Sequence, residues 1–365
     1  MLSLNPIIAR AVAVIGTTLA LVAQASELPA TARRIVVEKA GERFEWQLVQ
    51  APLPSIGDDQ VLLRVHAISL NRSEVARLNS QNFTEGVKIP VSDAAGEVVA
   101  IGRAVKSVRK GARVTSTHFR DWIDGPYSEK YLDAVYGWTI DGVAAEYVAL
   151  DARAVVPIAN NFTYEEASTL PTAALTAWNA VIGRTATQKN DVVLVQGTGG
   201  VSTFALQFAV AAGAYPIVTS SSDEKLARAR QLGARAGINY RNEPAWEQAV
   251  LRLTQGRGAD LVLDVVGKTT LEHSVQSLAD EGELAIIGGI TGYDGSLSSW
   301  GLLKKSAVAR GIFVGSRADF IRMNEFMGRH KLRPSIDRSY PVEKYAEALD
   351  AMASGNFMGK IVLTF

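Results

Sequence analysis

From about Thr163 onward, short apolar runs alternate with segments of helical periodicity. The runs have the length of buried strands, and the segments between them carry apolar residues on one helical face. Strands that alternate with helices form right-handed βαβ units, and six such strands are typical of a doubly wound, dinucleotide-binding parallel sheet. The predicted strands are Val192–Gln196, Pro216–Ser220, Ala236–Tyr240, Leu261–Val266, Leu284–Gly288 and Gly311–Val314, and the predicted helices are Val201–Ala212, Asp223–Leu232, Pro244–Thr254, Thr270–Ala279 and Leu302–Ala309.

The chain before residue 158 has a different character. Short β-branched segments such as 61–67 and 97–101 are separated by Gly, Pro and Asp, which predicts a mostly β domain over residues 31–157. The closing segment 331–365 contains a helical pattern near 342–353 and an apolar strand at 360–365, and we expect it to return to that domain. The α/β domain then covers 158–330.

The first 25 residues have the order of a secretory signal peptide. Arg10 precedes an apolar run, Ala11–Ala23, which is followed by Ala23-Gln24-Ala25, an A-x-A cleavage pattern. The run is too short to span a bilayer as a helix. The alternative is an ordinary N-terminal helix. If this segment is a signal peptide, the protein is expected to be periplasmic or secreted. If it is an ordinary helix, the protein is expected to be cytoplasmic.

Composition excludes several classes of function. The 38 basic and 37 acidic residues balance, so no basic surface for nucleic acid is expected. Cysteine is absent, which excludes disulfides, thiolate nucleophiles and cysteine-ligated zinc. The four histidines are scattered singly, so we expect no protein-held metal.

A glycine-rich loop follows the first predicted strand of the α/β domain. Gly197 is suited to a tight turn, and Gly199 and Gly200 leave backbone N–H groups open to a pyrophosphate at the start of a helix. Ser202 stands where the usual third glycine would be. A glycine-rich motif of this kind is weak evidence for dinucleotide binding by itself, but this one follows the first strand of the predicted sheet, where a dinucleotide-binding fold requires it. The alternative is a glycine turn without a ligand. The predicted phosphate-binding residues are Gly197, Thr198, Gly199, Gly200 and Val201.

The end of the second predicted strand favours NADP(H) over NAD(H). An NAD site usually has a carboxylate there, whereas this chain has three serines, Ser220, Ser221 and Ser222, with Lys225 one turn into the next helix. Tyr240 is expected near the adenine. Asp223 keeps NAD(H) open as the alternative cofactor.

The motifs taken together resemble the medium-chain dehydrogenase/reductase superfamily over nearly the whole chain after the signal segment. The resemblance extends to the subgroup labelled NAD(P)-dependent alcohol dehydrogenase-like. It implies a GroES-like catalytic domain, a Rossmann domain and an active site in the cleft between them. Homodimers are common in similar proteins, although the sequence does not fix the oligomeric state. The motifs are 67–71 (AISLN), 93–98 (DAAGEV), 110–114 (KGARV), 141–147 (DGVAAEY), 170–178 (LPTAALTAW), 196–201 (QGTGGV), 311–317 (GIFVGSR) and 359–362 (GKIV).

The resemblance also places this chain apart from the zinc-dependent members. The positions that match their catalytic zinc ligands are Asn71, Ser92 and Thr172, and none of these is a soft zinc ligand. Without a Lewis acid, oxidation of unactivated alcohols is disfavoured. The chain therefore resembles the zinc-free branch of quinone oxidoreductases and enone or enoyl reductases.

The matching positions suggest roles for individual residues. Asn71 is expected to donate a hydrogen bond to the substrate oxygen, Thr176 to lie beside the nicotinamide and His118 to donate a proton. The alternatives are a turn cap for Asn71, a hydroxyl bonded to its own helix for Thr176 and a structural role for His118. Further residues expected to meet the cofactor are Thr172, Gly288, Gly315, Ser316 and Lys360.

The predicted function is a zinc-independent, NADPH-dependent oxidoreductase that transfers hydride to a small quinone, enone or reactive carbonyl. One alternative is an alcohol or aldehyde dehydrogenase that uses NAD(P). The other is a non-catalytic nucleotide-binding protein on the same fold. No nucleic acid or membrane partner is expected.

Overall fold

The computed structural model describes residues 28–41, 43–78, 86, 88–159 and 161–365, and every structural statement below concerns these residues. The predicted signal peptide lies outside them. None of the helices in these ranges is long and apolar enough to cross a membrane.

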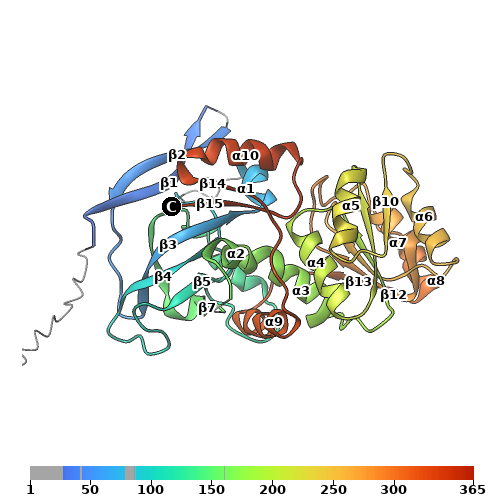
Figure 1. Cartoon of the computed structure of the whole chain (residues 1–365), viewed down its shortest axis with the longest axis horizontal. Coiled ribbons are helices and arrows are strands. Elements are labelled where there is room, and N and C mark those ends of the chain that lie inside the picture. Colours follow the sequence, from blue (N-terminus) through green and yellow to red (C-terminus); the bar gives the residue numbers. More distant parts are fainter. Residues whose placement is uncertain (1–27, 42, 79–85, 87, 160) are drawn as a thin grey trace, which may run out of the picture.

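A six-stranded parallel sheet with helices around it forms one half of the molecule, which is the right half of Figure 1. The strand order is β10-β9-β8-β11-β12-β13, which is the doubly wound order with its reversal between β8 and β11. This confirms the predicted α/β fold class. The strands are β8 (Val192–Gln196), β9 (Tyr215–Ser220), β10 (Ala236–Asn239), β11 (Ala259–Asp264), β12 (Leu278–Ile286) and β13 (Val308–Gly311), and the helices are α4 (Gly200–Ala211), α5 (Asp223–Gln231), α6 (Trp246–Leu253), α7 (Leu271–Ser277), α8 (Ser299–Lys305) and α9 (Arg317–His330).

The prediction for the sixth strand was wrong in position. The expected strand at Gly311–Val314 lies earlier, at Val308–Gly311, and the helix before it ends at Lys305 rather than near Ala309. Ser306 has a left-handed conformation with φ of 51°, which stops the helix. Val314 has φ of 50°, which no regular strand accommodates.

The other half of the molecule is mostly β. Its main sheet has the order β14-β15-β3-β4-β5-β7, with β6 also paired to β3. The C-terminal strand β15 pairs antiparallel with β3, so the closing segment returns to this half of the molecule, whereas β1 and β2 pair with each other in a separate two-stranded sheet. The strands are β1 (Thr31–Ala40), β2 (Arg43–Pro52), β3 (Gln60–Leu70), β4 (Asp93–Ile101), β5 (Arg113–Ser116), β6 (Tyr147–Asp151), β7 (Val155–Pro157), β14 (Ile336–Pro341) and β15 (Lys360–Thr364), and the helices are α1 (Arg72–Leu78), α2 (Tyr164–Ser168), α3 (Leu175–Trp178) and α10 (Tyr345–Ser354).

Three connections bring the two halves together. A run of helical turns, which includes the π-helical turn Leu170–Ala174 and α3, packs against α4. The N–H of Gly359 donates to the carbonyl of Thr198 over 2.9 Å, which fixes the start of β15 against the glycine loop. The N–H of Arg317 donates to Trp122 O over 2.9 Å. The loop after β8 therefore lies close to the start of β15 in the other sheet.

Candidate active site

The glycine loop after β8 has the shape of a phosphate cradle. Gly197 has φ of 72°, a conformation that side chains strain to adopt, and it turns the chain into α4. A Cβ placed on Gly199 would meet no atom within 4 Å, so the space above this residue is open. The N-terminus of α4, a 12-residue helix, begins at the next residue. These features fit a dinucleotide pyrophosphate, which the backbone N–H groups of the loop would hold.

Two neighbouring residues serve the packing of the loop. A Cβ on Gly200 would come within 2.6 Å of Lys360 Cδ, so this position has no room for a side chain. Ser202 is buried and donates to Gln196 O over 2.7 Å, which explains why a serine suits the place of the third glycine.

The residues predicted to bind a 2′-phosphate surround the end of β9. Ser220 is buried, and its hydroxyl accepts from the N–H of Ser222. Ser222 caps α5 by accepting from the N–H of Lys225, whose ammonium donates to Gly355 O over 2.8 Å. Tyr240 follows β10 and is exposed. Ser221 lies between these groups and is half-buried.

The residues predicted at the other end of the cofactor have clear packing roles. A Cβ on Gly288 would clash with Val265 O at 2.6 Å, and one on Gly315 would clash with Asn179 Nδ2 at 2.3 Å. Ser316 is buried as the N-cap of α9, where it forms a capping box with Asp319. The backbone at these positions leaves no space for larger residues.

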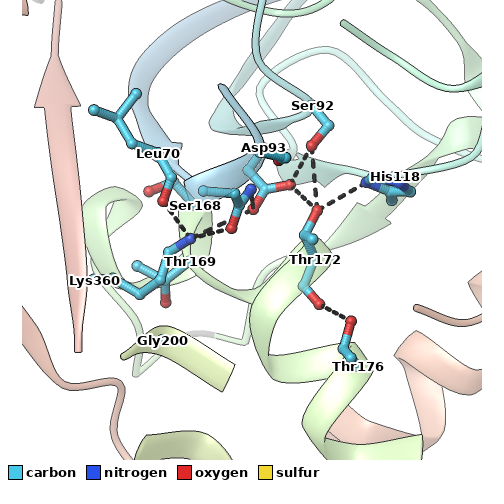
Figure 2. A network of polar contacts seen from close by, with 12 residues as sticks. Leu70, Ser92, Asp93, His118, Ser168, Thr169, Thr172, Thr176, Gly200 and Lys360 are labelled. Atoms are coloured by element: carbon cyan, nitrogen blue, oxygen red, sulfur yellow. Dashed lines mark hydrogen bonds and ion pairs between the residues drawn. The ribbon is translucent and has the colours of Figure 1, made fainter. Parts of the chain in front are cut away.

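A buried polar cluster lies next to the glycine loop, and Asp93 is its centre (Figure 2). We call Asn71, Ser92, Asp93, Thr172 and Lys360 the Asp93 cluster. The Asp93 carboxylate is fully buried and accepts from Asn71 Nδ2 over 3.0 Å and from Ser92 Oγ over 2.8 Å. Thr172 Oγ1 donates to the same oxygen that Ser92 contacts.

Lys360 joins this cluster to the glycine loop. Its ammonium donates to Leu70 O over 2.7 Å and to Asn71 Oδ1 over 2.5 Å, while its stem packs against Gly200. Burial lowers the pKa of Lys360, and the nearby Asp93 and Glu74 oppose that shift. Burial raises the pKa of Glu74 to about 7, and the charge of Asp93 contributes to the increase.

The three residues predicted as catalytic all lie at the Asp93 cluster. Asn71 hydrogen-bonds Asp93, whereas Thr176 and His118 both contact Thr172. Asn71 is half-buried and has both ends of its amide engaged, which leaves one Nδ2 hydrogen for a ligand. Thr176 donates its hydroxyl proton to Thr172 O over 2.7 Å. His118 Nδ1 lies 2.9 Å from Thr172 Oγ1, and burial lowers the pKa of this imidazole to about 4. His118 is therefore neutral near pH 7.

Asn71, Ser92 and Thr172, the positions predicted to match the zinc ligands of zinc-dependent members, all hydrogen-bond Asp93. Ser92 Oγ and Thr172 Oγ1 are 3.2 Å apart, and Asn71 reaches both through Asp93. An amide and two hydroxyls that already hydrogen-bond a carboxylate do not fit zinc, which prefers thiolate, imidazole and carboxylate ligands. The described residues contain no group of three or more His, Cys, Asp or Glu arranged to hold a metal ion.

Sequence reasoning missed two groups of the site. Asp93 stands within a quoted motif but has no predicted role, although a carboxylate that starts an apolar strand signals a buried polar site. Phe313 was placed inside a strand, whereas it follows β13 and stacks on Tyr127, with ring centroids 5.8 Å apart. The misplaced sixth strand concealed that contact.

Comparisons with known proteins agree with this architecture. Residues 57–160 match the family model described as alcohol dehydrogenase GroES-like domain, and residues 200–329 match the model described as zinc-binding dehydrogenase. A zinc-type alcohol dehydrogenase-like protein of Schizosaccharomyces pombe is 38% identical over 313 residues, which cover 83% of this chain and 90% of that protein. Prostaglandin reductase-3 of Mus musculus is 27% identical, with 93% and 91% covered.

Solved structures extend the likeness to three dimensions. A crystal structure of a Sinorhizobium meliloti protein matches with a TM-score of 0.87 at 37% identity, over 93% of this chain and all of that one. An NAD-dependent alcohol dehydrogenase matches with a TM-score of 0.81 at 30% identity, over 91% and 99% of the two chains. The predicted superfamily is thereby confirmed. The chain belongs to the medium-chain dehydrogenase/reductase superfamily of NAD(P)-dependent oxidoreductases.

Proposed function

We propose that this chain is an NADPH-dependent reductase that transfers hydride to a quinone, enone or reactive carbonyl without a metal. The observation that carries the proposal is the set of side chains at the matched zinc positions, which are hydrogen-bonded to one another around Asp93. A substrate with an electrophilic carbon needs only hydrogen bonding at its oxygen, whereas an alcohol needs help to lose its proton. Two relatives bear the names prostaglandin reductase-3 and 2-methylene-furan-3-one reductase.

In this proposal the chain positions the reactants and stabilises charge. A bound dinucleotide would supply the hydride, and the backbone of the glycine loop would hold its pyrophosphate. Asn71 directs its remaining Nδ2 hydrogen to the substrate oxygen, because Lys360 and Asp93 fix both ends of its amide. A fixed donor stabilises developing negative charge without reorganisation. Thr172 and Thr176 would border the nicotinamide, and Lys360, which packs against Gly200 and donates to Asn71, would hold Asn71 in place relative to the glycine loop.

Two further parts of the proposal concern the cofactor and assembly. Ser220, Ser221, Ser222 and Lys225 favour a 2′-phosphate, because no carboxylate ends β9 and a cation lies one turn beyond it. We also propose a homodimer that forms along β13. This strand ends the sheet order, and Trp300, Leu303 and Val308 are exposed in and just before it.

A panel of substrates tests the reaction. The purified protein is assayed with NADPH against quinones, enones and aldehydes, and with NADP⁺ and NAD⁺ against primary and secondary alcohols. We expect reduction of quinones or enones that a strong chelator leaves unchanged. Alcohol oxidation without any enone or quinone reduction, or stoichiometric zinc in the purified protein, would contradict the proposal.

A variant of Asn71 separates catalysis from binding. Replacing one oxyanion donor lowers kcat by about 100-fold or more. We therefore expect Asn71→Ala to lose kcat at that scale while its affinity for NADPH, measured by fluorescence titration, stays within about twofold. Full activity of this variant would remove Asn71 from the mechanism.

A further inference from the structure

His118 uses only one of its two ring nitrogens. The residue is 4% exposed, and its Nδ1 lies 2.9 Å from Thr172 Oγ1. Its Nε2 is buried, and no residue that the structure describes hydrogen-bonds it. Buried polar atoms in proteins nearly always have a partner, so an unpaired one calls for an explanation.

The hydrogen bonds around Asp93 fix where the imidazole proton lies. A hydroxyl has a single proton, and both Ser92 and Thr172 donate theirs to Asp93 Oδ1. Thr172 Oγ1 can then only accept from His118, so Nδ1 carries the proton. Since burial keeps the pKa of His118 at about 4, the ring is neutral near pH 7. Its Nε2 is therefore a bare acceptor.

Three aromatic side chains pack close to the imidazole. The ring centroids of Phe119, Trp138 and Phe313 lie 4.9, 6.3 and 6.4 Å from that of His118. Phe313 is 38% exposed, so this aromatic group reaches the surface. Phe119 and Phe313 carry no hydrogen-bond donor, and the indole N–H of Trp138 does not hydrogen-bond Nε2. Since no residue that the structure describes donates to Nε2, its donor would come from a ligand or a water molecule.

We propose that His118 determines substrate specificity, because its Nε2 accepts a hydrogen bond from a hydroxyl group of the substrate. The inference rests on the proposed reduction of enones and carbonyls at this site. A ketone, enal or quinone oxygen is an acceptor only and leaves Nε2 unpaired. A carbonyl compound with a hydroxyl near the carbon that receives the hydride satisfies it. An unmade bond to a buried group corresponds to about 10- to 100-fold in affinity.

Matched enals measure this preference. The probes are 4-hydroxy-2-hexenal and 4-methoxy-2-hexenal, which differ in the hydroxyl donor, and the readout is the ratio of their kcat/KM values with NADPH. We expect the hydroxy compound to be favoured by about 10- to 100-fold. The ratio should fall to near one in His118→Phe, and it should be unchanged in His330→Gln, which alters an exposed histidine on α9.

Variants of Thr172 test the hydrogen-bond direction rather than the presence of the ring. Thr172→Ser keeps the acceptor for Nδ1–H and should keep the ratio. Thr172→Val removes it, so the proton is free to move to Nε2, and the preference should disappear. Each variant is judged by the ratio of its kcat/KM values for the two enals, so a loss of activity that affects both enals equally does not change the result. A valine variant that retains the full preference would overturn the role of Thr172.

A measurement without turnover separates this inference from the proposed function. In protein labelled with ¹⁵N-histidine, the chemical shifts of His118 should show a protonated Nδ1 and a bare Nε2, and only the hydroxy enal should shift the Nε2 signal. A protein that binds the hydroxy enal preferentially but reduces neither compound would refute the proposed function alone. A proton on Nε2 would overturn the inference. Equal affinity for the two enals would overturn it as well, because it would mean that a bound water molecule, and not the substrate, donates to Nε2.

Discussion

Burial sets the charge of His118, and this has a consequence for stability. Its pKa is about 4 in the folded protein, and its ordinary value is 6.5. The unfolded chain therefore binds a proton at a higher pH than the folded one, and folding loses stability as the pH falls from about 6.5 to 4. A shift of this size corresponds to at most about 3 kcal/mol at pH 4.

The variant His118→Phe should remove that part of the pH dependence. Urea unfolding at pH 7, 5 and 4 measures it, with His330→Gln as the control for an exposed histidine. We expect the free energy of unfolding of the phenylalanine variant to fall less between pH 7 and 4 than that of the unmodified protein. Parallel pH profiles for the two proteins would show that His118 is not held neutral by the fold.

Lys225 carries the predicted choice of cofactor. Its ammonium donates to Gly355 O, while its backbone N–H donates to Ser222 Oγ at the start of α5. NADPH should bind more tightly than NADH, and Lys225→Ala should weaken NADPH by about 10- to 150-fold with little effect on NADH, because one charge-assisted contact is lost. Arg230→Ala removes an exposed cation from the same helix as the control. Equal affinity of the unmodified protein for both nucleotides would contradict the prediction.

Individual polar contacts were the least predictable part of the molecule. Asn71 and Asp93 are 22 residues apart, and Ser92 and Thr172 are 80 apart, so no local spacing pairs them. The family resemblance brought three of these positions together as matched zinc ligands. It did not indicate that Asp93 is their common partner, because that depends on burial and on the direction of each hydrogen bond.

Elements with a strong pattern were predicted well. The strand Val192–Gln196 was predicted with the bounds that β8 has, since a continuous apolar run ends there at a glycine turn. The strand after α8 was predicted at Gly311–Val314 because that segment is apolar. The less hydrophobic segment Val308–Gly311 forms the hydrogen bonds to β12 instead. Hydrophobicity marks burial, but it does not reveal the left-handed residue at Val314.

The loop between β8 and α4 allows a test of cofactor binding that spares the fold. Gly199 has φ of −74°, which alanine adopts, and its Cβ would enter open space. Alanine is a poorer N-cap than glycine, so Gly199→Ala should destabilise the free protein by about 1 kcal/mol or less. The added methyl group would occupy the space proposed for the pyrophosphate, and we expect NADPH affinity to fall at least tenfold.

Gly328→Ala is the matched control for that variant. Gly328 lies in α9, where a Cβ would also meet no atom within 4 Å. This change should stabilise the helix by up to about 1 kcal/mol and leave NADPH binding unchanged. Fluorescence titration gives the affinities and thermal unfolding gives the stabilities. Unchanged affinity in Gly199→Ala would mean that the loop does not hold the pyrophosphate.

At the scale of the whole molecule, one edge of the parallel sheet is open to a second copy. The strand β13 pairs with β12 on one side and ends the strand order, so its outer backbone groups are available to another strand. Exposed fractions of 68% for Trp300, 69% for Leu303 and 46% for Val308 place apolar surface beside that edge. Two copies that pair along this edge would cover both features at once.

The charged double variant Trp300→Glu with Leu303→Lys should therefore convert a dimer into a monomer. Sedimentation velocity at micromolar concentration measures the mass, and the expected result is a dimer for the unmodified protein and a monomer for the variant. Leu253→Glu, which changes an exposed leucine at the end of α6, should remain a dimer. NADPH affinity should persist in the monomer, because the glycine loop and the Asp93 cluster come from one chain. A monomeric unmodified protein would leave the exposed edge of β13 without this explanation.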